Sequence, residues 1–186
     1  MDLQLSNQVA VVIGGASGIG LATARAFAAE GAPVAVLDRN PDVAAIAQQI
    51  GDEFGVAALG RVLDVTNYED VRVAAAAVEA ELGPVTHVVN TAAVGSGKGG
   101  FPFWNLEPGD WDFVFKVGVM GVVNTAHAFA EVMRPRRQGS FLFLGSVAGQ
   151  IGSQTDPPYS AAKAALLNFT QCAARTWPRT TSASTS

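Results

Sequence analysis

Residues 9–20 read VAVVIGGASGIG, and this stretch decides the fold. The apolar run at 9–13 is short and rich in valine, which is typical of a central strand in a parallel sheet. Residues 21–30 are helix-forming and stop at a glycine. A strand, a glycine-rich turn and a helix therefore follow one another with no spare residues.

The turn itself predicts a phosphate-binding site. Gly14, Gly18 and Gly20 allow the backbone to turn tightly and to approach a ligand closely. The amides at the start of the next helix, with Ser17 and Ile19 in the same turn, favour an anion such as a pyrophosphate. The spacing is Gly-x-x-x-Gly-x-Gly, which differs from the ordinary dinucleotide fingerprint. Taken alone, the turn is also compatible with a tight strand-to-helix connection that binds nothing.

The alternation continues along the chain and predicts the fold class. Apolar runs and amphipathic stretches alternate, which implies an α/β protein with a doubly wound, Rossmann-like parallel sheet between two helix layers. We expect one domain over residues 1–175 and a disordered tail over 176–186. The further expected strands are 33–37, 57–63, 85–89 and 141–144, and the further expected helices are 42–54, 68–82, 110–133 and 159–175.

An acidic residue at the end of the second expected strand indicates the cofactor. Asp38 stands eighteen residues after Gly20, where a carboxylate accepts hydrogen bonds from an adenosine ribose. The same charge repels a 2′-phosphate, so the sequence favours NAD over NADP. Arg39 weakens this preference, because an arginine there can meet the extra phosphate.

A second group of residues predicts acid–base chemistry. Tyr159 and Lys163 are four residues apart in an expected helix and so share one face. The lysine cation favours the phenolate, which suits Tyr159 to act as a general acid or base. Ser146 follows the strand at 141–144 and is expected to hydrogen-bond a substrate oxygen. A Tyr-x-x-x-Lys pair also occurs on many helices by chance.

The composition limits the other function classes. The chain has 12 basic and 16 acidic residues, and the only basic cluster, Arg134, Arg136 and Arg137, is interpreted as a solvated helix end, so nucleic acid is not an expected partner. His87 and His127 are unclustered, so no metal site is expected.

The chain also carries expectations about its location. It contains one cysteine, Cys172, which fits a reducing compartment. We find no signal peptide and no run of about eighteen apolar residues. The expected location is therefore the cytoplasm, with no membrane partner.

These motifs occur in one order, and together they resemble the short-chain dehydrogenase/reductase family over roughly residues 8–175. The resemblance implies an oxidoreductase that moves a hydride between a nicotinamide and a secondary alcohol or ketone. It implies that Tyr159 exchanges the proton, that Lys163 also binds the nicotinamide ribose, and that Ser146 orients the substrate. It further implies that Asp64 and Val65 contact the adenine. It places Asn90 and Ala92 at the end of the sheet beside the cofactor, where Asn90 stabilises the sheet.

The chain departs from the family pattern at three positions. Ile13 replaces a threonine and Ala93 replaces a glycine, and both changes are expected to be tolerated. Gly118 replaces the asparagine that helps to hold a proton-relay water near the lysine. Asn124 lies on another helix face and is not expected to substitute for it.

The last residues differ most from the family pattern. Relatives continue with further strands, a helix and a substrate-covering loop, so we expect the last strands of the family fold to be missing and strand 141–144 to be poorly covered. We hypothesise that 176–186 is read out of frame, which the gene sequence would test. The alternative function is thus a truncated, catalytically impaired dinucleotide-binding module. The helices at 110–133 and 159–175 are the expected contacts of a homo-oligomer.

Overall fold

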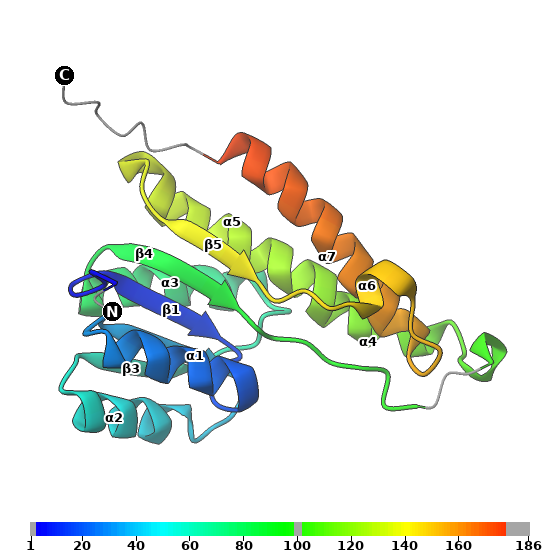
Figure 1. Cartoon of the computed structure of the whole chain (residues 1–186), viewed down its shortest axis with the longest axis horizontal. Coiled ribbons are helices and arrows are strands. Elements are labelled where there is room, and N and C mark those ends of the chain that lie inside the picture. Colours follow the sequence, from blue (N-terminus) through cyan, green and yellow to red (C-terminus); the bar gives the residue numbers. More distant parts are fainter. Residues whose placement is uncertain (1–2, 99–101, 178–186) are drawn as a thin grey trace.

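The structure is a computed structural model that describes residues 3–98 and 102–177 (Figure 1). Its five strands form one parallel sheet in the order β3-β2-β1-β4-β5, which confirms the predicted doubly wound α/β fold. The strands are β1 Val9–Ile13, β2 Val34–Asp38, β3 Ala58–Val62, β4 Val85–Asn90 and β5 Ser140–Phe143. The α-helices are α1 Gly18–Ala29, α2 Val43–Phe54, α3 Tyr68–Leu82, α4 Gly109–Phe115, α5 Gly121–Met133, α6 Ala148–Ile151 and α7 Pro157–Thr176.

The sheet lies between two helix layers because successive residues of a strand point to opposite faces. Val11 and Ile13 of β1 join one core cluster with α3 and α5, whereas Ala10 and Val12 join the other with α1 and α2. Figure 1 shows α1 and α2 on one side of the sheet and α3, α5 and α7 on the other. Both faces of β1 are thereby covered, which explains its continuous apolar run.

The register brings the strand ends to one edge of the sheet. Ile13 is opposite Leu37 on β2 and opposite Asn90 on β4, and Asn90 is opposite Phe143 on β5. Strand order reverses between β1 and β4, and in such sheets ligands bind beyond the strand ends at this switch point.

The helix expected at 110–133 is continuous but not uniform. A π-helical turn, η2 (Lys116–Met120), separates α4 from α5 and contains Gly118. Glycine is a poor helix former, and π turns are frequent at functional sites. A 3₁₀ turn, η3 (Arg134–Arg136), follows α5, another, η1 (Phe103–Asn105), precedes α4, and α6 forms one helical turn inside the expected loop after Ser146.

The basic cluster is not simply solvated, and that interpretation is wrong for Arg136. Its guanidinium donates hydrogen bonds to both carboxylate oxygens of Glu79 on α3, at 2.6 and 2.8 Å. It also donates to the carbonyl oxygen of Val85, at 3.2 Å. Arg136 therefore ties the end of α5 to the start of β4.

The fold extends beyond the expected boundary at residue 175. The indole nitrogen of Trp177 donates a 3.0 Å hydrogen bond to the carbonyl oxygen of Gly139, and its ring meets the Phe141 ring edge-on at 4.8 Å. Trp177 therefore belongs to the folded part, and the remainder of the expected tail, 178–186, lies outside the described residues. The other face of β5 is open, because Leu142 is 53% exposed. Its outer edge is also open, because β5 pairs only with β4 in the described chain.

By length and composition the helical stretch Gly109–Arg136 is apolar enough to cross a membrane. In its most apolar window 44% is buried inside the fold. Its buried residues include Phe129 and Met133, which belong to the core cluster shared with α3. A core helix of this kind satisfies the same length and composition test.

Candidate functional site

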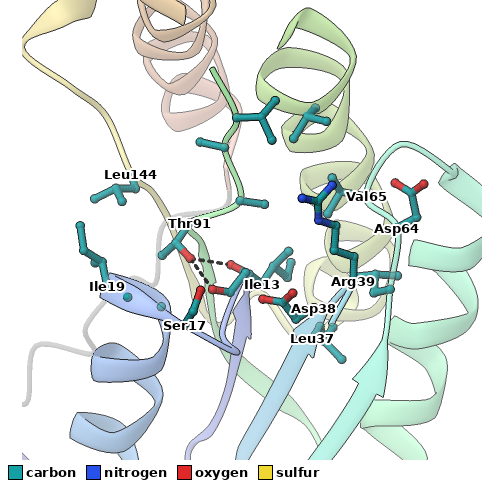
Figure 2. Close-up of a pocket in the computed structure, with 18 of the residues that line it drawn as sticks. Ile13, Ser17, Ile19, Leu37, Asp38, Arg39, Asp64, Val65, Thr91 and Leu144 are labelled. Atoms are coloured by element: carbon teal, nitrogen blue, oxygen red, sulfur yellow. Dashed lines mark hydrogen bonds between the residues drawn. The ribbon is translucent and has the colours of Figure 1, made fainter. Parts of the chain in front are cut away.

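A cavity of about 430 Å³ opens beyond the strand ends at the switch point (Figure 2). The cavity brings together ten of the residues predicted to bind a cofactor, namely Gly14, Ser17, Gly18, Ile19, Gly20, Asp38, Arg39, Asp64, Val65 and Ala92. The other lining residues are Ile13, Leu37, Leu63, Thr91, Ala93, Val94, Phe113, Val117 and Leu144.

The glycine turn forms one wall of the cavity. Gly14 has a φ of 76°, which favours glycine, and a Cβ on Gly20 would collide with the carbonyl oxygen of Gly14. The Thr91 hydroxyl donates to the carbonyl oxygens of Ile13, at 2.8 Å, and Gly14, at 3.2 Å. Thr91 was not predicted, and its position at the end of β4 was the only local signal.

The helix start is available to an anion. Ser17 is the N-cap residue of α1, and within the described part of the chain its side chain makes no capping hydrogen bond. The first-turn amides of α1 therefore lack this partner, and the helix dipole favours negative charge at this end. A Cβ on Gly18 would meet no heavy atom of the described residues within 4 Å, and Gly18 lines the cavity, so the backbone there is open to it. A pyrophosphate fits this arrangement.

Asp38 is fixed by two backbone amides. Its Oδ2 accepts a 3.0 Å hydrogen bond from the Ala16 amide, and its Oδ1 accepts a 2.9 Å hydrogen bond from the Asn40 amide. Each oxygen keeps a further lone pair for a ligand hydroxyl. Arg39 lies at the same cavity and is exposed (Figure 2).

Asp64 is held in its ionised form at the far end of the cavity. The Thr66 amide donates to its Oδ1 at 2.8 Å. This bond, with one from the Thr66 hydroxyl, lowers the pKa of Asp64, and the charges of Lys116 and Arg39 lower it further.

Helix α5 positions Val65 beside Asp64. The Asn124 amide donates a 2.9 Å hydrogen bond to the carbonyl oxygen of Val65. A Cβ on Gly121 would lie 2.7 Å from Cγ2 of Val65, so the glycine allows this close approach. The side-chain amide of Asn124 therefore holds the backbone at Val65.

Asn90 does not line the cavity. It is 3% exposed, donates from Nδ2 to the Thr125 hydroxyl at 2.9 Å, and accepts at Oδ1 from the Ala92 amide at 2.9 Å. Its side chain thus fixes Ala92, which does line the cavity, and joins the sheet end to α5.

Tyr159 and Lys163 lie together in α7, as their spacing predicts. The Lys163 ammonium nitrogen is 5.6 Å from the centroid of the Tyr159 ring. Lys163 is only 5% exposed, and burial lowers its pKa. Its ammonium donates a 2.5 Å hydrogen bond to the carbonyl oxygen of Leu144, which lines the cavity. Helix α7 is thereby joined to the cavity wall.

Ser146 follows β5 two residues beyond Leu144. Its hydroxyl oxygen accepts a 3.2 Å hydrogen bond from the Ala148 amide. A Cβ on Gly149 would lie 2.7 Å from the carbonyl carbon of Lys163, so α6 and α7 are in close contact there. This contact fixes the Ser146 segment against α7.

Gly118 has no side chain to act near Lys163. It is buried, and a Cβ there would lie 3.3 Å from the Cβ of Ala162, the neighbour of Lys163. The departure from the family pattern at 118 thus falls at the contact between η2 and α7.

A second, more open groove of about 510 Å³ lies near the start of α7. Pro102, Phe103 and Trp104 line one side, and Phe103 and Trp104 are 67% and 69% exposed. The segment 152–154 and Pro157 line the other side. In the glycine-rich and aromatic stretch 95–105, residues 102–104 line this groove, and 99–101 lie outside the described residues.

Comparisons with known proteins agree with this geometry. Residues 8–181 match the family described as short chain dehydrogenase. The chain is 34% identical over 174 residues to a 2-(S)-hydroxypropyl-CoM dehydrogenase of Xanthobacter autotrophicus. This alignment covers 92% of this chain and 66% of that protein. The chain is 36% identical over 175 residues to an acetoacetyl-CoA reductase of Synechocystis, which covers 94% of this chain and 68% of that protein.

Solved structures give the same result. L-sorbose reductase from Gluconobacter frateurii, complexed with NADPH and L-sorbose, superposes with a TM-score of 0.86 at 31% identity, over 94% of this chain and 66% of that one. NAD⁺-bound xylitol dehydrogenase superposes with a TM-score of 0.86 at 29% identity, over 92% of this chain and 65% of that one. The chain belongs to the short-chain dehydrogenase family. It spans about two thirds of the length of these relatives.

Proposed function

We propose that this chain is an NAD(H)-dependent oxidoreductase that transfers a hydride between the nicotinamide and a secondary alcohol or ketone. The observation that carries the proposal is the hydrogen bond from Lys163 to Leu144, which links the Tyr159 helix to the cavity. The relatives' names, which are those of dehydrogenases and reductases, support the same class of reaction.

The residues would divide the work as follows. Bound nicotinamide supplies or accepts the hydride. Tyr159 gives a proton to the substrate oxygen in reduction and takes it in oxidation. Lys163 favours the phenolate of Tyr159 through its charge and binds the nicotinamide ribose. The Ser146 hydroxyl orients the substrate oxygen.

We propose NAD as the preferred cofactor. Asp38 is held at the cavity by two amides, and an ionised carboxylate there disfavours a 2′-phosphate. Arg39 at the same cavity is the feature that favours NADP. The solved relatives include complexes of both cofactors, so the proposal depends on Asp38 rather than on similarity.

A second candidate function is dinucleotide binding without turnover, which Gly118 favours. A glycine there supplies no side chain to hold a relay water near Lys163. Replacing Gly118 with Asn would place a Cβ 3.3 Å from that of Ala162, so the variant should be paired with Ala162→Gly to make room. If the relay limits turnover, Gly118→Asn/Ala162→Gly will be faster than Ala162→Gly alone.

One experiment separates the two candidates. NADH is titrated by its fluorescence, and oxidation of NADH is then followed with a panel of ketones, or reduction of NAD⁺ with secondary alcohols. Binding with turnover supports the oxidoreductase. Binding without turnover supports the binding module. Absence of binding of both NADH and NADPH rejects both candidates.

We also propose a homo-oligomer and a cytoplasmic location. The helices predicted to form the contact carry exposed apolar side chains, namely Phe113, Met120 and Leu167, at 51%, 50% and 45% exposure. Sedimentation of the wild-type chain and of Leu167→Lys tests the contact. Cys172 is a free, exposed thiol, which a reducing compartment would preserve.

A further inference from the structure

Asp156 precedes the catalytic helix and bonds to two separate parts of the chain. As the N-cap of α7, it accepts at Oδ1 a 3.3 Å hydrogen bond from the Tyr159 amide. Pro157 and Pro158 occupy the first two helical positions and have no N–H, so Tyr159 carries the first amide of the helix. The capped residue is therefore the tyrosine itself.

The other oxygen of the same carboxylate holds the loop after β4. Oδ2 accepts a 2.9 Å hydrogen bond from the Ser96 amide, sixty residues away in sequence. Ser96 lies two residues after Val94, which lines the cavity. The same loop is held a second time at Lys98, whose ammonium nitrogen is 2.7 Å from a carboxylate oxygen of Asp110. The carboxylate thus bridges the cavity wall and the first turn of α7.

Gly95 provides the space for this bridge. A Cβ built on Gly95 would lie 2.5 Å from Oδ2 of Asp156, and this is the closest contact it would make. The backbone of Gly95 is not in the left-handed region, so among the described residues alanine there meets a steric conflict only with Asp156.

We propose that Asp156 is a positioning residue that sets the separation between Tyr159 and the segment 92–96, of which residues 92–94 line the cavity. A small displacement of a reacting group lowers the rate far more than it lowers binding. The chemical consequence rests on the proposed function, whereas the bridge itself does not.

The decisive variant is Asp156→Asn. Asparagine and aspartate are comparable N-caps, so a residue that only caps α7 would be replaced without effect. A bridge needs two acceptor oxygens, and asparagine has one. We therefore expect the Ser96 amide or the Tyr159 amide to exchange with solvent deuterium at least about tenfold faster in Asp156→Asn. Wild-type exchange at both amides would overturn the proposal.

Gly95→Ala tests the bridge from the other side. We expect Gly95→Ala to speed hydrogen exchange at the Ser96 amide. In the Asp156→Ala background it should cause no further increase in the exchange rate, because both changes remove the same hydrogen bond between Ser96 and Asp156. Gly145→Ala is the matched control, since a Cβ there meets no heavy atom of residues 3–98 and 102–177 within 4 Å. Additive effects of Gly95→Ala and Asp156→Ala would contradict a shared bridge.

The kinetic readout separates positioning from simple stability. Asn67 caps α3 through the Glu69 and Asp70 amides, so Asn67→Ala removes a cap remote from Tyr159. We expect Asp156→Ala to lower kcat at least about tenfold with the NADH dissociation constant within about twofold, and Asn67→Ala to leave both unchanged. Equal kcat values for the two variants would overturn the positioning role. If the wild type binds no NADH, the proposed function fails, and the exchange measurements still decide whether the bridge exists.

Discussion

The Lys163 ammonium donates a 2.5 Å hydrogen bond to the carbonyl oxygen of Leu144, and Leu144 lines the cavity formed by the glycine turn and Asp38. Two regions far apart in sequence are therefore one structural unit. Leu144, which directly follows β5, therefore lines the cavity and also holds the lysine that lies beside the Tyr159 ring.

The glycine turn should be intolerant of one added methyl group. A Cβ on Gly20 would collide with the carbonyl oxygen of Gly14 and would lie 2.6 Å from the Thr91 hydroxyl. We expect Gly20→Ala to weaken NADH binding by at least about tenfold in a fluorescence titration, because the turn must open. Gly145→Ala should bind normally, and an unchanged affinity in Gly20→Ala would contradict the assignment of the turn.

Asp38 should control the choice of cofactor. Asp38→Asn removes the negative charge but keeps one acceptor, so NADH binding should weaken by about tenfold while NADPH binding improves. The matched control is Asp52→Asn, which makes the same charge change on the exposed face of α2. If both variants change the ratio of the two affinities equally, Asp38 is not the determinant.

His87 should make the fold sensitive to mild acid. Its ring bonds to Ser140 and Gln8, and burial lowers its pKa below 6.5. Below about pH 6.5 the unfolded chain therefore binds a proton more readily than the folded one, and stability is lost as the pH falls through the lowered pKa.

Urea unfolding at a series of pH values measures this effect. The chain has two histidines, and the side chain of His127 is 65% exposed, so His127→Gln is the control. We expect the loss of unfolding free energy between about pH 7 and pH 5 to shrink in His87→Gln and to persist in His127→Gln. The reverse result would place the sensitivity elsewhere.

Trp177 should stabilise the edge strand. Trp177→Ala removes a hydrogen bond to Gly139 and the contact with Phe141, which should lower the unfolding free energy by about 1–3 kcal/mol. Trp104 is 69% exposed, so Trp104→Ala should change it by less than about 0.5 kcal/mol. Equal effects would mean that Trp177 does not pack in solution.

The sequence predicts the strands and the glycine turn well because their signals are local. Short valine-rich runs mark β1 and β2, and Asp38 is the last residue of β2. The cavity lining by Asp38, Asp64 and Val65 follows from parallel strands ending at one edge.

The features that the sequence did not predict depend on contacts between distant residues. The π turn of η2 lies within an otherwise helical pattern, and its single glycine, Gly118, is the only local signal for it. The bridge from Asp156 to Ser96 and the pair of Arg136 with Glu79 join residues 60 and 57 positions apart. The periodicity of the sequence does not predict such pairs, because their residues meet only once the helices and the sheet have packed together.

The most direct test of the proposed oxidoreductase is turnover by wild type and Tyr159→Phe under identical conditions, followed by the absorbance of NADH with the ketone panel. Phenylalanine keeps the ring beside Lys163 and removes only the hydroxyl. We expect measurable turnover in the wild type and a loss of about 10²-fold or more in Tyr159→Phe, with NADH affinity unchanged. Turnover that survives in Tyr159→Phe, or NADH binding by a wild type that turns over no substrate, would contradict the account.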